Sequence, residues 1–401
     1  MKRRMLSLAL AACLAMSLTA CGSKEETPAA PGGDSEAGSP ILLGTISPNT
    51  GNLATYGSAI LNGVNLAVEE INAAGGVLGT TLEVVSADDQ GDPTECQNAF
   101  NSLVTQGVGL IVGSVTSSCT SAITDAANEE EVCLMSPSST ADSITTEDDY
   151  VFRACYADSF QGAIAAAYAK QSGLARVGVV YCAADTYSKG LYDSFSAACE
   201  KYGVEIAAVE STASMDVQDY TNQFASMAKA GVELVYAPYY YDVIGPYLVT
   251  QARAAGYTGI IMGADGYDGT PDYVVDGADL SAFNEVYWTN HYDPADESEL
   301  VQNFVKAFQD RYGETPMAMS ALAYDCVYMY KQAIEAAGAS DAAAVRDALA
   351  DNSATYERVT GTYSLDETGT PVKGATIVSF AEQDGAVTTT LVDVVKELPD
   401  A

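Results

Sequence analysis

Short apolar runs alternate along this chain with longer stretches whose apolar residues recur at helical spacing. The first pair is the run at residues 41–46, followed by a stretch that carries Ile60, Val64 and Ile71 on one face and stops at Gly75. A brief apolar run bounded by turn residues indicates a buried strand, and three-to-four spacing over a longer window indicates an amphipathic helix. A glycine after the last periodic residue is a common helix terminator. The folded part of the chain therefore begins with a strand and a helix.

The same alternation continues to Arg153 and then restarts. In the first run we predict strands at residues 41–46, 82–85, 109–112 and 132–135. In the second run we predict strands at residues 177–181, 204–209, 232–236 and 259–262. Strands that alternate with helices imply a parallel sheet covered on both faces. Two such runs predict two similar α/β lobes. Beyond them we predict helices at 300–312, 318–337 and 341–349, and strands at 361–364 and 376–380.

The first forty residues do not belong to this pattern. Lys2, Arg3 and Arg4 precede an apolar stretch at 5–18 that is too short for an ordinary membrane span, so residues 1–20 are expected to be a signal peptide. The string that ends at Cys21 resembles the lipobox of bacterial lipoproteins, in which the cysteine is lipidated; the alternative is an ordinary secretory signal with a chance cysteine. Either reading predicts export. The segment that follows, to residue 40, has no large apolar side chain and is expected to be a flexible tether.

Composition narrows the function classes. The 401 residues are 48% hydrophobic and 18% charged, which is typical of a globular chain long enough for two lobes. The formal net charge of −36 argues against nucleic-acid binding, because nucleic acid carries the same sign of charge. Seven of the nine cysteines remain once Cys13 and Cys21 are set aside. Export would permit disulfides, but an odd number leaves at least one cysteine without an intramolecular partner.

The usual catalytic motifs are missing from the sequence. His291 is the only histidine, so a zinc-protease helix is impossible, and no G-x-S-x-G elbow or P-loop is present. No C-x-x-C pair suggests a zinc site, and the aspartate clusters do not follow EF-hand spacing. His291 lies in a predicted connection, and we interpret it as structural. We therefore expect no catalytic residues, no cofactor and no metal.

Polar residues gather just after several predicted strands, where ligands of open α/β sheets bind. Serine and threonine make up most of residues 114–120 and 136–140 in the first half. In the second half, aromatic and acidic residues occupy 185–187 and 238–242, and Asp265 follows the last predicted strand. Donors on one lobe and a carboxylate with aromatic rings on the other suit a zwitterion. For any single hydroxyl run, helix capping and turn formation remain the alternative.

Several motifs, taken in order, match one family. They are Pro48-Asn49-Thr50-Gly51 with Tyr56-Gly57 and Gly63, Glu69-Glu70-Ile71-Asn72 before Gly75-Gly76, Gln251 to Gly256, Gly263-Ala264-Asp265-Gly266, and Gly361-Thr362-Tyr363 with Asp366 to Gly369. From Ile41 onward the chain resembles the type I periplasmic binding proteins, specifically the leucine/isoleucine/valine-binding proteins of branched-chain amino acid ABC transporters. The resemblance implies two Rossmann-like α/β lobes, joined by three hinge crossovers, that close on a ligand in the interlobe cleft.

The resemblance also implies roles for particular residues. Ser117 and Thr140 would bind the ligand carboxylate with help from Ser138, Asp265 would hold the ammonium group with Tyr187 beside it, and Tyr56 and Tyr240 would line the side-chain pocket. The tyrosine run around Tyr240 departs from the family's usual smaller residue before the tyrosine, so the choice of amino acid stays open. In this family cysteines near Cys96 and Cys119 can pair.

The resemblance implies an importer component with these partners: a free amino acid, the permease subunits, and the bacterial cell membrane through lipid on Cys21. We expect a monomer. The alternatives are a sensory receptor module of the same fold and a surface enzyme. The expected boundaries are a signal peptide at 1–20, a lipidated linker at 21–40, an N-terminal lobe at 41–156 that continues at 289–355, and a C-terminal lobe at 157–288 that continues at 356–401.

Overall fold

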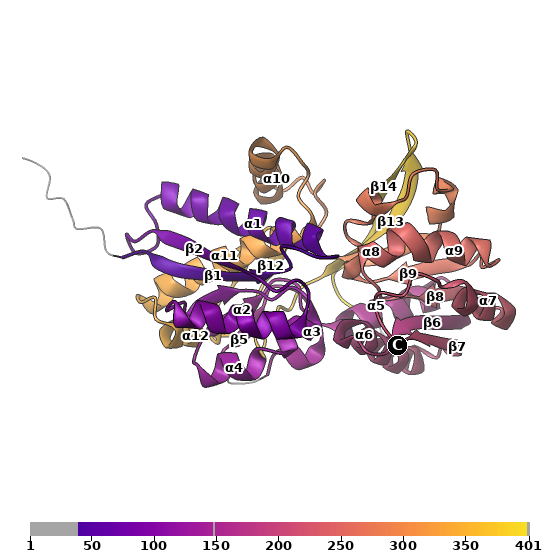
Figure 1. Cartoon of the computed structure of the whole chain (residues 1–401), viewed down its shortest axis with the longest axis horizontal. Helices are drawn as coiled ribbons and strands as arrows, with labels where there is room; N and C mark the ends of the chain where they lie inside the picture. Colours follow the sequence, from indigo (N-terminus) through magenta and orange to yellow (C-terminus); the bar gives the residue numbers. More distant parts are fainter. Residues whose placement is uncertain (1–38, 147–148, 399–401) are drawn as a thin grey trace, which may run out of the picture. The chain divides into compact units, whose positions relative to one another are not determined.

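The computed structural model describes residues 39–146 and 149–398 (Figure 1). The predicted signal peptide, the lipidation residue Cys21 and nearly all of the predicted tether lie outside these residues. Within the described ranges, no helix is both long enough and apolar enough to cross a membrane.

The first lobe is built on a five-stranded parallel sheet in the order β2-β1-β3-β4-β5. The strands are β1 (Ile41–Ser47), β2 (Leu82–Asp88), β3 (Leu110–Val112), β4 (Cys133–Ser136) and β5 (Val151–Arg153). The helices between them are α1 (Ala54–Ala73), α2 (Pro93–Thr105), α3 (Ser117–Ser121) and α4 (Thr124–Glu129). Strands β3 and β4 are buried throughout, as expected of strands covered on both faces. The four strands predicted for this lobe are confirmed, and β5 was not predicted.

The second lobe has a seven-stranded sheet in the order β14-β13-β10-β9-β8-β6-β7. Its parallel strands are β6 (Arg176–Cys182), β7 (Glu205–Thr212), β8 (Leu234–Tyr236), β9 (Ile260–Gly263) and β10 (Val286–Asn290). Strands β13 (Ala375–Gln383) and β14 (Ala386–Val395) extend it antiparallel. The helices are α5 (Asp158–Gln171), α6 (Thr186–Tyr202), α7 (Thr221–Ala230), α8 (Tyr241–Val243) and α9 (Val249–Ala254), with a π-helical turn at Ile244–Leu248 that joins the last two.

Three further helices return to the first lobe: α10 (Glu299–Tyr312), α11 (Ala318–Ala337) and α12 (Ala342–Leu349). Helix α11 packs along α1, and the hydroxyls of Tyr324 and Tyr328 both donate to Glu70 of α1. A small hairpin, β11 (Tyr356–Arg358) with β12 (Gly361–Tyr363), packs near α11, so the chain re-enters the second sheet only at β13. The chain therefore crosses between the lobes after β5, after β10 and before β13. The exact lobe boundaries remain a prediction.

Helix α6 shows how local sequence sets the position of a site residue. The side chain of Asp185 accepts a hydrogen bond from the backbone N–H of Ser188, which caps the N-terminus. Gly203 ends the helix in the left-handed conformation, with a φ of 69° that favours glycine. The cap fixes where the first turn begins, and Tyr187 lies in that turn.

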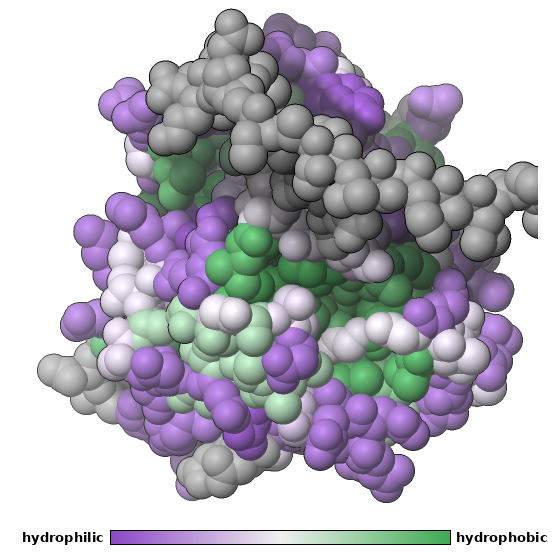
Figure 2. Space-filling view, turned by 90° about the vertical axis from the view of Figure 1, so that its left-hand side faces the viewer, coloured by the Kyte–Doolittle hydropathy of each residue, from purple (hydrophilic) through white to green (hydrophobic). Residues whose placement is uncertain are grey.

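The end of the first lobe that faces the viewer in Figure 2 is polar around its rim, with apolar surface toward its middle.

Replacing Gly63 with alanine is expected to destabilise the fold. Gly63 lies on α1 where α11 crosses, and a Cβ atom there would collide with the backbone carbonyl of Ser320. Alanine favours a helix over glycine by about 1 kcal/mol, but a backbone collision cannot be relieved by a rotamer change. We expect a net loss of roughly 1–3 kcal/mol in the free energy of unfolding. Urea denaturation measures it.

Gly109→Ala is the matched control. A Cβ atom at Gly109 would meet only the Cβ of Ala342, at 3.6 Å, which is an ordinary contact. Equal stability changes for the two variants would contradict the close approach of α1 and α11.

Candidate functional site

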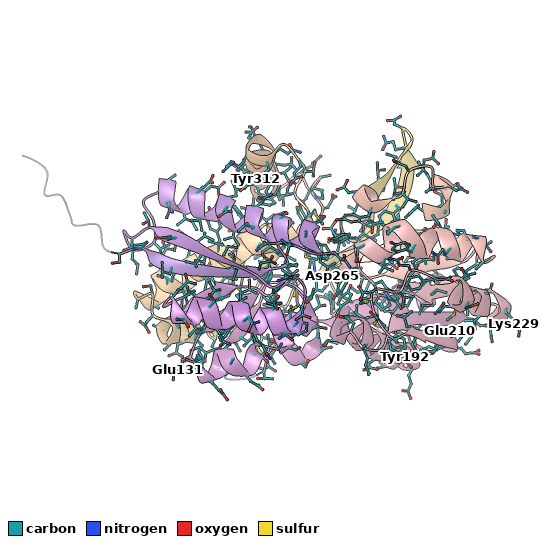
Figure 3. All side chains as sticks on the ribbon, in the orientation of Figure 1. Glu131, Tyr192, Glu210, Lys229, Asp265 and Tyr312 are labelled. Carbon is teal, nitrogen blue, oxygen red and sulfur yellow. The ribbon has the colours of Figure 1, made fainter. Side chains whose placement is uncertain are left out.

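A small space lies between the two lobes, beside the ends of β3, β4 and β9. Its volume is about 10 Å³, roughly the space that one water molecule needs. The residues that line it are Tyr56, Val115, Thr116, Ser117, Ser138, Tyr187, Tyr240, Asp265, Gly266 and Met319. Figure 3 shows Asp265 at this position between the lobes. Six of the seven predicted binding residues are in this lining. The seventh, Thr140, is fully buried but does not line the space.

The wall from the first lobe consists of two loops that hydroxyl groups join. Ser138 donates its hydroxyl to the carbonyl of Val115 at 2.9 Å. Ser117 accepts a hydrogen bond from the backbone N–H of Ala141 at 3.2 Å. That bond uses a lone pair of the Ser117 oxygen and leaves its proton free to be donated. Ser117 can therefore offer a hydrogen bond to a carboxylate placed in the space.

A buried arginine supports one of these loops. Arg153, at the end of β5, is 2% exposed. Its guanidinium donates to the carbonyls of Thr140 and Ala141 at 3.0 and 2.9 Å, and to the hydroxyl of Thr370 at 2.8 Å. Arg153 therefore holds the loop in place by neutralising carbonyl dipoles, and it is a supporting residue that the sequence pattern did not single out.

The wall from the second lobe centres on Asp265, which is 2% exposed. One carboxylate oxygen accepts from Gln161 Nε2 and from the Tyr187 hydroxyl, both at 3.0 Å. The other lies 3.2 Å from His291 Nε2. The Tyr187 oxygen in turn accepts from the backbone N–H of Gly266 at 2.9 Å. Three side chains, from α5, α6 and the crossover after β10, therefore fix the orientation of this carboxylate.

A second buried carboxylate lies close by. Asp158 begins α5 and is 0% exposed, and its backbone N–H donates to the carbonyl of Thr140 at 2.7 Å. Within the described residues, neither carboxylate oxygen has a hydrogen-bond partner, and neither does the Thr140 hydroxyl. Burial raises the pKa of Asp158 well above its usual 3.8; the nearby Thr140 hydroxyl lowers this pKa and the charge of Asp265 raises it further. A cation or a hydrogen-bond donor placed here would give the Asp158 carboxylate the partner that it lacks.

Three tyrosine rings form the remaining wall. Tyr187 stacks on Tyr240 with ring centroids 5.0 Å apart, and Tyr56 meets Tyr240 edge-on at 6.3 Å. Burial raises the pKa of all three hydroxyls well above 10.0, so they stay neutral. The hydroxyl of Tyr240 has no partner within the described residues. The wall is apolar in its rings and carries one hydroxyl that can still form a hydrogen bond.

The lobes touch directly around this space. The Tyr56 hydroxyl, from the first lobe, donates to the carbonyl of Gly266 at 2.7 Å. Ser118 donates to Asp185 at 3.1 Å and accepts from the backbone N–H of Thr186 at 3.2 Å. The remaining volume is far too small for an amino acid, so a ligand could enter only if the lobes moved apart. Larger surface hollows of about 360 to 460 Å³ exist elsewhere, but these binding residues do not line them.

Sequence reasoning missed Asp158, Gln161 and His291. The first two are three residues apart on the first turn of α5, a helix that the alanine-rich sequence did not reveal. His291 was interpreted as structural because it lies in a connection, but its side chain is fully buried against Asp265. No local pattern marks these three residues, because their partners are distant in the sequence.

One group of described residues offers metal-ligand chemistry away from this site. A carboxylate oxygen of Asp89 and the sulfur atoms of Cys96 and Cys119 lie within 4.8 Å of one another, and all three residues are buried. Such a set could bind a soft cation or, in an oxidising compartment, join its two thiols.

Comparisons with known proteins identify the family of this chain. Residues 40–386 match the profile of a family described as periplasmic binding protein. The Leu/Ile/Val-binding protein homolog 3 of Brucella melitensis is 31% identical over 331 residues, which cover 82% of this chain and 88% of that protein. The leucine-, isoleucine-, valine-, threonine- and alanine-binding protein of Pseudomonas aeruginosa is 31% identical over 337 residues, which cover 84% of this chain and 88% of that protein.

Solved structures give the same picture. The branched-chain amino acid transporter substrate-binding protein LivJ of Streptococcus pneumoniae, in complex with isoleucine, matches with a TM-score of 0.79 at 33% identity, covering 88% of this chain and 99% of that one. The leucine-binding protein LivK of Thermotoga maritima matches with a TM-score of 0.80 at 28% identity, covering 89% and 99%.

Asp158→Asn is expected to stabilise the ligand-free protein at neutral pH. The raised pKa means that ionising Asp158 costs more in the folded state than in the unfolded state. This penalty is absent below the unfolded pKa near 3.8 and is complete above the folded pKa. The amide cannot ionise, so the variant avoids this penalty, which is worth about 1.4 kcal/mol for each pH unit between the unfolded pKa and the lower of the folded pKa and the pH of the measurement. Calorimetry at acid and neutral pH measures it.

The exposed Asp276 provides the control, because Asp276→Asn should show no pH-dependent gain in stability. A wild-type protein more stable than Asp158→Asn at neutral pH would show that the carboxylate is matched after all.

Refolding under oxidising conditions is expected to join Cys96 to Cys119, because their sulfur atoms lie within 4.8 Å of each other and both side chains belong to one buried cluster. A cross-link over a loop of this length should add about 3 kcal/mol to the free energy of unfolding. Peptide mapping by mass spectrometry identifies the pair, and Cys96→Ser should abolish it. Pairing of Cys119 with a different cysteine would contradict the expectation.

Proposed function

Because this chain belongs to the periplasmic binding protein family, we propose that it captures a free amino acid outside the cytoplasm and delivers it to an ABC importer. The observation that carries the proposal is the Asp265 carboxylate, buried between the lobes and held by three donors opposite two hydroxyl-lined loops. The names of the relatives favour leucine, isoleucine or valine as the ligand.

In this proposal the ligand lies across both walls. Its carboxylate accepts from Ser117 and from the loop of Ser138 and Thr140. Its ammonium group binds Asp265, with Asp158 as a second acceptor. Charge-assisted hydrogen bonds in a buried site are short and strong, so they would fix the backbone common to all amino acids. Support comes from the free proton of Ser117 and the two unpaired oxygens of Asp158.

The side chain of the ligand would contact Tyr56, Tyr240 and Met319, which line the rest of the space. Ring faces and a methionine suit an apolar branched side chain. The unpaired Tyr240 hydroxyl also allows a ligand with one polar group. The affinity order among amino acids follows from how well each matches these contacts.

Binding would proceed by lobe closure about the three crossovers. The hydrogen bonds that now join Tyr56 to Gly266 and Ser118 to Asp185 would open to admit the ligand. A ligand between the lobes would then replace them with contacts to both walls. The closed, loaded form is the one that would dock on the permease.

We further propose that lipid on Cys21 anchors the protein to the outer side of the bacterial cell membrane. Residues 21–40 would then link the lipid to the lobes, and a chain of that length has a reach of about 25 Å. A monomer suffices, since both walls of the site come from one chain. We expect no turnover of amides or esters.

Thermal unfolding with each free amino acid is the direct test. An amino acid present at 100 times its dissociation constant should stabilise the protein by about 2.7 kcal/mol, an easily detected shift. We expect leucine, isoleucine or valine to give the largest shift. If no free amino acid shifts the midpoint, the proposal is wrong and the ligand is to be sought among amides, peptides or other small metabolites.

Asp265→Asn should then lose most of the affinity, because the ammonium group loses its buried counter-charge. Removing one partner of a buried, hydrogen-bonded charge pair costs about 2–5 kcal/mol of binding free energy. Isothermal titration calorimetry measures the loss. The exposed Asp276→Asn, on the same lobe, should bind as the wild type does.

A further inference from the structure

His291 is the only histidine of the chain and directly follows β10 in the second crossover. Its side chain is 0% exposed and its Nε2 lies 3.2 Å from Asp265 Oδ2. Its ring stacks on Tyr156, with centroids 4.0 Å apart. Packing on one face and a polar contact at one edge hold the imidazole in a single orientation toward the carboxylate.

We propose that His291 is a positioning residue of the binding site, which orients Asp265 while neutral and weakens amino acid binding when protonated. The inference rests on the proposed function and adds a pH-dependent regulation to it. A carboxylate oxygen can only accept a hydrogen bond, so the neutral ring must carry its proton on Nε2. In that tautomer His291 completes the set of donors to Asp265 and leaves the negative charge unbalanced, ready for an ammonium group.

Protonation would reverse this arrangement. A second proton would go to Nδ1, which is buried and has no partner within the described residues. The resulting cation would balance the charge of Asp265 from inside the protein. An incoming ammonium group would then meet a carboxylate that is already neutralised, with a like charge directly behind it.

Some groups near the ring raise the pKa of His291 and others lower it. Burial lowers the pKa of His291 below 6.5, Asp265 raises it, and the positive charge of Lys373 lowers it. Lys373 comes from the connection before β13, and burial lowers its own pKa to about 8, so it is positive at acid pH. Tyr156 offers a neutral ring, since burial raises the pKa of its hydroxyl. The remaining charged residues of the adjoining groove are Asp293, Asp296, Glu357, Arg358 and Lys396. The imidazole is therefore neutral at neutral pH, and its charge appears on acidification.

The sign of the effect follows from linkage. A bound ammonium group disfavours the protonated ring, so binding must expel one proton once the pH is below the pKa of His291 in the free protein. One coupled proton raises the dissociation constant by at most about tenfold per pH unit. Above that pKa the affinity should not depend on this residue.

Nuclear magnetic resonance tests the inference directly, because a single histidine gives a single imidazole titration without assignment. The purified protein should carry a tag free of histidine. The probe is L-isoleucine, or the amino acid that gives the largest thermal shift. Its addition should lower the pKa of the imidazole, and an unchanged titration curve would overturn the inference. Asp265→Asn should also lower it in the ligand-free protein, so this arm holds even if no amino acid binds.

Two substitutions separate positioning from simple structural support. His291→Gln keeps an amide donor near the position of Nε2 but cannot titrate. His291→Leu removes the donor. In the wild type the dissociation constant should begin to rise once the pH falls below the pKa of the imidazole that the titration gives, by at most about tenfold for each further pH unit. His291→Gln should bind within about threefold of the wild type at neutral pH and lose the histidine part of the rise, whereas His291→Leu should bind weakly both above and below that pKa.

Carboxylates such as Asp158 titrate in all these variants. The difference between the wild type and His291→Gln in the pH dependence of the dissociation constant therefore gives the contribution of the imidazole. Parallel profiles would contradict the inference and leave amino acid capture intact. A wild type that binds no free amino acid at any pH would instead contradict the proposed function.

Discussion

The site depends on the burial of one carboxylate. Asp265 is 2% exposed, and a buried charge is costly unless its hydrogen bonds are satisfied and its charge is balanced. The protein satisfies the hydrogen bonds with Gln161, Tyr187 and His291, which come from two helices and a crossover. Among the described residues, no lysine or arginine forms an ion pair with that carboxylate, and the guanidinium of Arg153 donates to carbonyls of the opposite loop. The donors orient the group while its charge stays unmatched, which is the condition that a ligand with an ammonium group can relieve.

Other buried polar groups in and near the space also lack a hydrogen-bond partner within the described residues. The oxygens of Asp158 and the hydroxyls of Thr140 and Tyr240 are buried and have no partner within the described residues. Each such group costs free energy in the ligand-free state, because a polar atom removed from water has lost a hydrogen bond. A substitution that removes one of these unpaired groups would therefore favour the fold, whereas the site would lose a group that can bind a ligand. The same unpaired groups therefore lower the stability of the ligand-free protein and provide the hydrogen-bonding groups for a ligand.

The strand ends could be predicted from the sequence because parallel strands bring their carboxyl ends to one edge of a sheet. Turn chemistry and apolar runs located the polar stretches at those ends, and the family resemblance then singled out Ser117, Tyr187 and Asp265 within them. The residues that support Asp265 could not be found this way. Gln161 is 104 residues from Asp265, on an alanine-rich helix with little contrast between its faces. His291 follows a strand that was not predicted, and nothing local to it indicates burial. Short-range patterns identify the groups that meet a ligand, whereas the residues behind them are set by tertiary packing.

His291 lies in the crossover after β10, so the residue that contacts the Asp265 carboxylate is part of a segment that joins the lobes. The next residue, Tyr292, donates its hydroxyl to the carbonyl of Pro316 and packs against Phe304 of the first lobe. The donor to Asp265 and an anchor on the opposite lobe are therefore neighbours in the chain. Any rotation of the lobes about this crossover must bear on the His291 ring, which Tyr156 and Asp265 hold from two sides. A change of charge at Asp265 and the proposed change of angle between the lobes would consequently act on the same short segment, which would couple the charge of the ligand to lobe closure.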